Sequence, residues 1–124
     1  MTEEQNKQGL VEIKAYIRPE RVSDVIGALE NLGVCQMTII DVQAMGRGVD
    51  PKDFKYSFEL VERYSTLARL ELVCPHVRTD AILEAIADQA HTGQRGDGFA
   101  YVTPVRQAVD LRTGSRLSRT VASS

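Results

Sequence analysis

The sequence predicts an α+β fold in which two successive β-α-β units form one domain. Three observations point to this fold. A strand pattern begins each unit, alternating in the first and apolar in the second, apolar residues at helical spacing follow it, and a long polar connection separates the units. The 124 residues suffice for one domain with its own core. A content of 43% hydrophobic and 26% charged residues is ordinary for a soluble globular protein.

The first unit follows a polar segment, residues 1–10, that we expect to be a disordered tail. Residues 11–18 alternate between apolar and polar side chains, which predicts a strand that Pro19 ends. Apolar residues at helical spacing over 22–32 predict a helix, with Gly33 as its stop. The β-branched residues within 37–45 predict the second strand.

The second unit begins with an apolar strand over 67–73, which Pro75 closes. Thr79 and Asp80 are predicted to cap a helix that runs to about residue 90 and ends at the segment 91–93. Apolar residues within 101–105 predict the fourth strand. The segment 115–124 is polar and lacks a core face, so we expect a C-terminal tail there.

The order of these elements favours the ferredoxin-like βαββαβ fold over residues 11–114. This fold is a four-stranded antiparallel sheet with two helices on one face. The outward positions of the strands are not uniformly polar, so we expect the bare face of the sheet to take part in oligomerisation.

Composition excludes several classes of function. The net charge of −2 argues against nucleic acid or an anionic membrane as the main partner, and no apolar run is long enough to span a membrane. The N-terminus lacks the apolar stretch of a signal peptide, so we expect a cytoplasmic protein. Cys35 and Cys74 lie in apolar surroundings and are expected to be reduced and buried, with a disulfide or redox switch as the alternative. No spacing of histidines and cysteines predicts a metal site.

The connection between the second and third strands, about residues 46–64, is longer than a hairpin requires. Aromatic and apolar residues alternate in its second half, at Phe54, Tyr56, Phe58 and Leu60. One interpretation is an extended hairpin arm that packs on itself. The other is a mobile loop that responds to a ligand and contacts a protein partner.

Three turns rich in glycine and arginine lie at strand ends. They are Gly46-Arg47-Gly48, the stretch from Thr92 to Gly98 that contains Gly96-Asp97-Gly98, and Arg112-Thr113-Gly114. Glycines let backbone N–H groups surround an anion, and arginine clamps phosphate. Each turn alone is typical of an ordinary hairpin or surface loop. Together they predict a nucleotide-phosphate site.

The sequence resembles the PII signal-transduction (nitrogen regulatory) proteins without gaps from about Val11 to Gly114. The motif Thr92-Gly93-x-x-Gly96-Asp97-Gly98 matches the B-loop of that family, Arg112-Thr113-Gly114 matches its C-loop, and Gly46-Arg47 match the base of its T-loop. The resemblance implies a homotrimer with nucleotide sites between subunits, in which Arg112 comes from the neighbouring subunit. It implies that these residues bind the nucleotide: Thr38, Gly46, Arg47, Glu71, Thr92, Gly96, Asp97, Gly98 and Arg112.

The chain departs from the family pattern at several functional positions. Gly48 replaces a glutamine that coordinates magnesium, and Leu67 replaces a lysine that pairs with 2-oxoglutarate, so we expect 2-oxoglutarate to bind weakly or not at all. Phe99 and Asp110 replace two cations of the phosphate clamp, which favours ADP or AMP over ATP. Leu60 stands where a uridylylated tyrosine stands in enteric members.

These departures resemble a divergent PII-like branch associated with inorganic-carbon uptake and carboxysomes. We therefore expect a signalling protein that couples ADP or AMP, through its T-loop at about 46–64, to a small anion such as bicarbonate held by Gly46, Arg47 and Gly48. The loop would regulate a transporter or enzyme of carbon metabolism. The alternatives are a nitrogen sensor of ATP and 2-oxoglutarate, a slow nucleotide hydrolase, which lacks a paired nucleophile and base, and a trimeric metal-tolerance protein.

Overall fold

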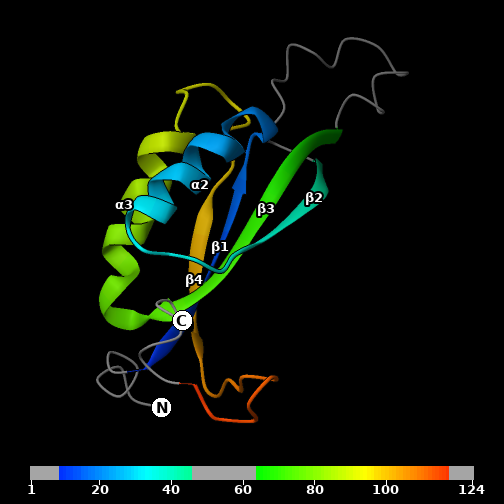
Figure 1. Cartoon of the computed structure of the whole chain (residues 1–124). Coiled ribbons are helices and arrows are strands. Elements are labelled where there is room, and N and C mark those ends of the chain that lie inside the picture. The colour runs from blue at the N-terminus through cyan, green and yellow to red at the C-terminus, as the bar shows by residue number, and fades with distance from the viewer. Residues whose placement is uncertain (1–8, 46–63, 118–124) are drawn as a thin grey trace.

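The computed structural model describes residues 9–45 and 64–117, which form a four-stranded antiparallel sheet with two helices packed on one face (Figure 1). The strand order is β2-β3-β1-β4, so β3 and β1 are central and β2 and β4 are the edges. The predicted ferredoxin-like arrangement is confirmed. The elements are β1 (Leu10–Ile17), α2 (Val22–Asn31), β2 (Thr38–Met45), β3 (Tyr64–Pro75), α3 (Thr79–Ala90) and β4 (Ala100–Val105).

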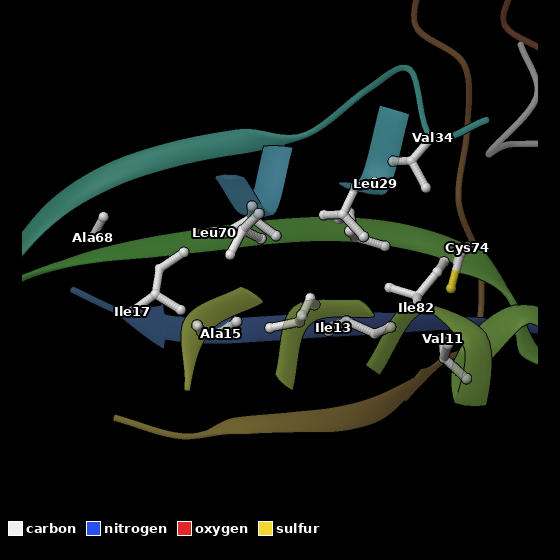
Figure 2. Packing of buried hydrophobic residues seen from close by; sticks show 14 residues of the cluster. Val11, Ile13, Ala15, Ile17, Leu29, Val34, Ala68, Leu70, Cys74 and Ile82 are labelled. Carbon is white, nitrogen blue, oxygen red and sulfur yellow. The ribbon is translucent and has the colours of Figure 1, made fainter. Parts of the chain in front are cut away.

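The core lies between the sheet and the two helices (Figure 2). It exists because alternate residues of β1 point to the helical face, where Val11, Ile13, Ala15 and Ile17 are buried. They pack with residues of β3 such as Leu70 and with the apolar faces of both helices. Burial of each large aliphatic side chain contributes about 1.5–3 kcal/mol, so this layer is the main source of stability.

Two arginines link the start of each helix to the end of the other helix. Short 3-10 turns, Pro19–Arg21 and His76–Arg78, precede α2 and α3. Arg21 Nε donates to the carbonyl of Gln89 near the end of α3, at 2.7 Å, and Arg78 Nη2 donates to the carbonyl of Leu32 at the end of α2. Each cation satisfies orphan carbonyls and complements the helix dipole.

The predicted cap of α3 by Thr79 and Asp80 is wrong. The N-cap residue is Arg78, and it makes no side-chain capping bond. Thr79 already belongs to the helix, is buried, and donates its hydroxyl to the carbonyl of His76 at 2.7 Å. The 3-10 turn therefore supplies the entry geometry that a capping side chain supplies elsewhere.

Strand bounds differ from the prediction at both ends of the domain. β1 begins at the buried Leu10, one residue before the predicted domain start at 11. β3 exceeds the predicted 67–73 because β2 pairs with its first part, residues 64–71, and β1 pairs with its last part, residues 68–75. At the other end, residues 115–117 are not tail, because Leu117 N–H donates to the carbonyl of Ala108 at 2.8 Å and closes a hairpin. Most of both predicted tails lies outside the described residues.

The cysteines have different environments. Cys74 is buried in the core as expected, and burial raises the pKa of its thiol. Cys35 is exposed in the segment that leads into β2, so the prediction that it is buried is wrong. Its apolar neighbour Val34 takes the core position instead.

Candidate functional site

The B-loop, residues 92–98, is organised around the carboxylate of Asp97. Its Oδ2 accepts the backbone N–H groups of Thr92 and Gly93, each at 2.9 Å. Its Oδ1 accepts the hydroxyl of Thr92 and, at 2.9 Å, Nε of Arg18. The hydrogen bond from the Thr92 side chain, followed by that from Arg18, holds the pKa of Asp97 well below its usual range. The Asp97 side chain thus positions the backbone of the loop.

Gly98 is required by the approach of the B-loop to β1. Its φ is +84°, and a Cβ at this position would lie 1.9 Å from the carbonyl oxygen of Tyr16. The next residue continues the contact, because Tyr16 N–H donates to the carbonyl of Phe99 at 2.8 Å. Packing on β1 therefore accounts for this glycine before any ligand is considered. Gly96 also has a positive φ, of +97°.

Phe99 belongs to an exposed aromatic patch that we define as Tyr16, Phe99 and Tyr101. The ring centroids lie 5.2 Å apart for Tyr16 and Phe99, 5.9 Å for Phe99 and Tyr101, and 6.4 Å for Tyr16 and Tyr101. The planes are within 23–24° of parallel. Because the three distances are similar, the rings form a broad patch and not a column. Phe99, the residue directly after the B-loop, is therefore an uncharged ring held by packing against two tyrosines.

Arg69 connects the aromatic patch to Glu71 on the sheet face opposite the helices. A hydrogen bond from Arg69 is the main cause that lowers the pKa of Tyr16, and a hydrogen bond with Tyr101 adds to it. The same hydrogen-bonded pair raises the pKa of Tyr101. Arg69 Nε also lies 2.9 Å from Glu71 Oε2. This ion pair places the Arg69 guanidinium beside Glu71, a predicted nucleotide-binding residue.

Thr38 and Glu71, the predicted adenine and ribose residues, face each other as register partners on β2 and β3. They line a cavity of about 530 Å³ together with Met37, Val73 and the C-loop residues Ala108 and Leu117. We define the C-loop as residues 106–117. The structure therefore brings Thr38 and Glu71 to the base of the C-loop, in a cavity of the size that suits a small-molecule ligand.

Arg112 lies in a turn that Asp110 holds. Asp110 Oδ1 accepts the backbone N–H groups of Arg112, at 2.8 Å, and Thr113, at 3.4 Å. Gly114 N–H donates to the carbonyl of Asp110 at 2.7 Å. Asp110 is therefore an organiser of the turn as well as an anionic replacement for a cation, and Arg112 is presented to solvent.

The predicted site residues are not brought together within one chain. The B-loop leads into the start of edge strand β4, whereas the C-loop follows its end, so about 20 Å of extended strand separates them (Figure 1). Thr38 lies on β2, the opposite edge of the sheet. The predicted site residues thus fall into two halves, which are the B-loop and, at the base of the C-loop, Thr38 with Glu71.

Some predicted residues cannot be placed, and others were missed. Gly46, Arg47 and Gly48 lie outside the described residues, as does Leu60. Leu67 is buried in β3 opposite Val42 and offers no charge. Sequence reasoning missed Arg18, which binds the B-loop across the fold, and Tyr16, on which Phe99 packs. No local pattern marks either role, because both arise from tertiary contacts.

Residues 9–45 and 64–117 contain no cluster of histidine, cysteine and acidic side chains arranged to hold a metal ion. None of the helices in the same ranges has the length and hydrophobicity needed to cross a membrane.

Comparison with known proteins places this geometry in context. The model of the family described as "Nitrogen regulatory protein P-II" matches residues 10–115. Nitrogen regulatory protein GlnK2 of Haloferax mediterranei is 33% identical over 115 residues, which cover 88% of this chain and 89% of the relative. Nitrogen regulatory protein P-II of Haemophilus influenzae is 34% identical over 102 residues, which cover 82% and 91%. The crystal structure of Arabidopsis thaliana PII bound to citrate superposes with a TM-score of 0.71 at 25% identity, covering 87% and 85% of the two chains.

Proposed function

Because this chain belongs to the nitrogen regulatory protein P-II family, we propose that it is a homotrimeric signalling protein that binds adenine nucleotides between its copies and favours ADP or AMP over ATP. It acts in the cytoplasm as a regulator and not as an enzyme. Its T-loop, about residues 46–64, couples the nucleotide to a small anion such as bicarbonate and regulates a partner in carbon metabolism.

One observation carries the proposal: the two halves of the site lie far apart in the chain. Thr38 and Glu71 line a cavity at the base of the C-loop, and the B-loop lies at the other edge and end of the sheet. A ligand that contacts both halves has to lie between two copies. Because a closed ring of identical copies repeats the same contact at every interface, each copy gives one half to each neighbour.

The preference for ADP or AMP rests on charge around the phosphates. Phe99, the residue that follows the B-loop, is neutral and stacks on Tyr16 and Tyr101. Asp110 adds a negative charge two residues before Arg112, its carboxylate turned to the C-loop backbone. Each additional phosphate brings negative charge that these positions do not compensate, so affinity falls as the phosphate chain grows.

The anion component of the proposal rests on Gly46, Arg47 and Gly48. One guanidinium with a glycine on each side of it in the sequence suits a planar ion of the size of bicarbonate. The Arabidopsis relative was crystallised bound to citrate, which supports carboxylate recognition within the family. The buried Leu67 supplies no second cation for a dicarboxylate.

Isothermal titration calorimetry tests the proposal. ADP, AMP and ATP are titrated into the protein with and without bicarbonate, and Arg47→Gln serves as the matched variant for the anion. We expect ADP or AMP to bind more tightly than ATP, and bicarbonate to strengthen binding by a coupling of about 1–3 kcal/mol that Arg47→Gln abolishes. Unchanged affinity with bicarbonate removes the anion component, and absence of nucleotide binding removes the whole proposal.

The second candidate is a nitrogen sensor of ATP and 2-oxoglutarate. The names of the similar relatives, nitrogen regulatory proteins, favour it. Gly48 and Leu67 weigh against it, because neither provides a ligand for magnesium or a charge for the second carboxylate. The same titrations with 2-oxoglutarate decide between the two: synergy with ATP supports the nitrogen sensor.

A further inference from the structure

An apolar cavity of about 360 Å³ opens directly beside the B-loop. Leu83 and Ile86 of α3 form one wall, and Gly98 and Phe99 form the rim toward the loop. Three of the other lining residues have small side chains, namely Ala87, Ala90 and Ala100. Interiors of proteins are close-packed, so an open apolar space of this size at a surface is typical of a binding site for an apolar group.

A matching apolar group lies on the C-loop. Leu111 is 94% exposed, and Val109, two residues earlier, is 43% exposed. The backbone around Leu111 is fixed by the Asp110 turn, which includes the bond from Arg112 N–H at 2.8 Å. A fixed turn thus holds Leu111 almost wholly in solvent, with Val109 close by, so both side chains are available to an apolar surface of a partner.

The charges flanking the two features are opposite. Asp80, Glu84 and Asp88 are exposed at a spacing of four residues along α3, and this helix contains no basic residue. The C-loop instead exposes Arg106, Arg112 and Arg116. An acidic stripe beside the cavity and a basic loop around the leucine are complementary, which favours docking of one on the other.

We propose that Leu111 of one copy packs into the cavity beside the B-loop of the next copy. The C-loop cannot reach the cavity of its own chain, because it follows the far end of β4. The inference rests on the proposed function, which brings Arg112 of one copy to the neighbouring B-loop. Leu111 would then be the apolar anchor that sets the reach of Arg112, and it would contribute to assembly whether or not nucleotide is bound.

Disulfide crosslinking tests the contact directly. Leu111→Cys is combined with Ala87→Cys in a Cys35→Ser background, oxidised, and examined on non-reducing gels. The matched control pairs Ala87→Cys with Val77→Cys, because Val77 is also highly exposed, at 81%, but lies before α3. We expect covalent dimers and trimers from the first pair only. Crosslinking no stronger than the control, or confined to single chains, overturns the inference.

A second measurement does not depend on introduced cysteines. Leu111→Ser removes the anchor, and Ala87→Trp fills the cavity; each is expected to raise the dissociation constant of the assembly at least tenfold, as determined by analytical ultracentrifugation. Assembly that neither substitution changes contradicts the contact and leaves the cavity to a different occupant, such as a small apolar ligand.

The two proposals fail separately in these experiments. If copies crosslink through residues 87 and 111 but no adenine nucleotide binds, the interface stands and the proposed function is wrong. If ADP binds tightly and the crosslink does not form, the proposed function stands and the anchor is wrong.

Discussion

Arg18 donates its Nε–H to Asp97 Oδ1 at 2.9 Å and thereby joins the end of β1 to a B-loop that lies 79 residues away in sequence. Its Nη2 also donates to the carbonyl of Arg95 at 2.7 Å. With the bonds from Thr92 and Gly93, every described contact of the Asp97 carboxylate goes to the protein. These bonds within the protein hold the shape of the B-loop.

Asp97→Asn is expected to lower the free energy of unfolding at pH 7 and to loosen the B-loop. The folded pKa of Asp97 lies well below its usual value of 3.8, so its contribution to stability is present above about pH 4 and is lost as pH falls through the folded pKa. The difference in stability between wild type and variant should therefore narrow below about pH 4. Urea unfolding over a pH series measures it.

Asp80→Asn is the matched control for that series, because Asp80 is exposed in the first turn of α3 and makes no contact with the B-loop among the described bonds. It should show only a small change in stability. A gap between wild type and Asp97→Asn that stays constant down to pH 2 would mean that the carboxylate charge does not hold the loop.

Gly98→Ala is expected to destabilise the fold. The new Cβ would meet the carbonyl oxygen of Tyr16 at 1.9 Å, and the positive φ alone costs about 1–3 kcal/mol for a residue with a side chain. Gly27→Ala is the control, because no atom lies within 4 Å of its added Cβ and alanine favours the helix by about 0.5–1 kcal/mol. Thermal unfolding should shift in opposite directions, and equal shifts would contradict the packing.

Phe99→Lys is expected to raise the affinity for ATP relative to ADP by about tenfold, because an ammonium group beside the B-loop can pair with the terminal phosphate. Phe99→Ala separates this gain from the loss of stacking on Tyr16 and Tyr101. The ratio of the two dissociation constants, from calorimetry, is the observable. A ratio that Phe99→Lys leaves unchanged removes the argument from charge.

Asp110→Asn tests the second altered position. Asparagine keeps an oxygen for the N–H groups of Arg112 and Thr113, so the turn should persist while the negative charge is lost. We expect the affinity for ATP to rise by about two- to fivefold relative to ADP. Asp110→Ala removes both the charge and the turn, and a result identical to Asp110→Asn would show that the turn does not position Arg112.

The fold could be predicted from sequence because its signals are periodic. Alternation in 11–18 and helical spacing over 22–32 each identify one element and the face that it buries. Element ends were less predictable, since the start of α3 depends on a 3-10 turn and the length of β3 depends on two neighbouring strands. The same limit applies to Cys35. A shift of one position along the chain decides whether Val34 or Cys35 enters the core, and the structure places Val34 there.

The candidate site could be predicted only in part. Glycine turns and Arg112 are visible in the sequence, but the partners that fix them are not: Arg18 and Tyr16 act on residues about 80 positions away. The resemblance places Asp97 in the turn that lies under the phosphates, and only the structure shows that its side chain accepts hydrogen bonds from the loop backbone. Only the sheet order reveals that Thr38 lies on the edge strand opposite β4, the strand that follows the B-loop.

Binding of ADP by mixed copies tests the shared site most directly. Glu71→Gln damages the cavity half and Asp97→Asn damages the B-loop half, and each variant alone should bind ADP poorly. If every site takes one half from each of two copies, trimers reassembled from equal amounts of both variants regain about a quarter of the wild-type sites. If both halves came from a single chain, every site would keep one defect, and the mixture would bind no more ADP than the two variants measured separately.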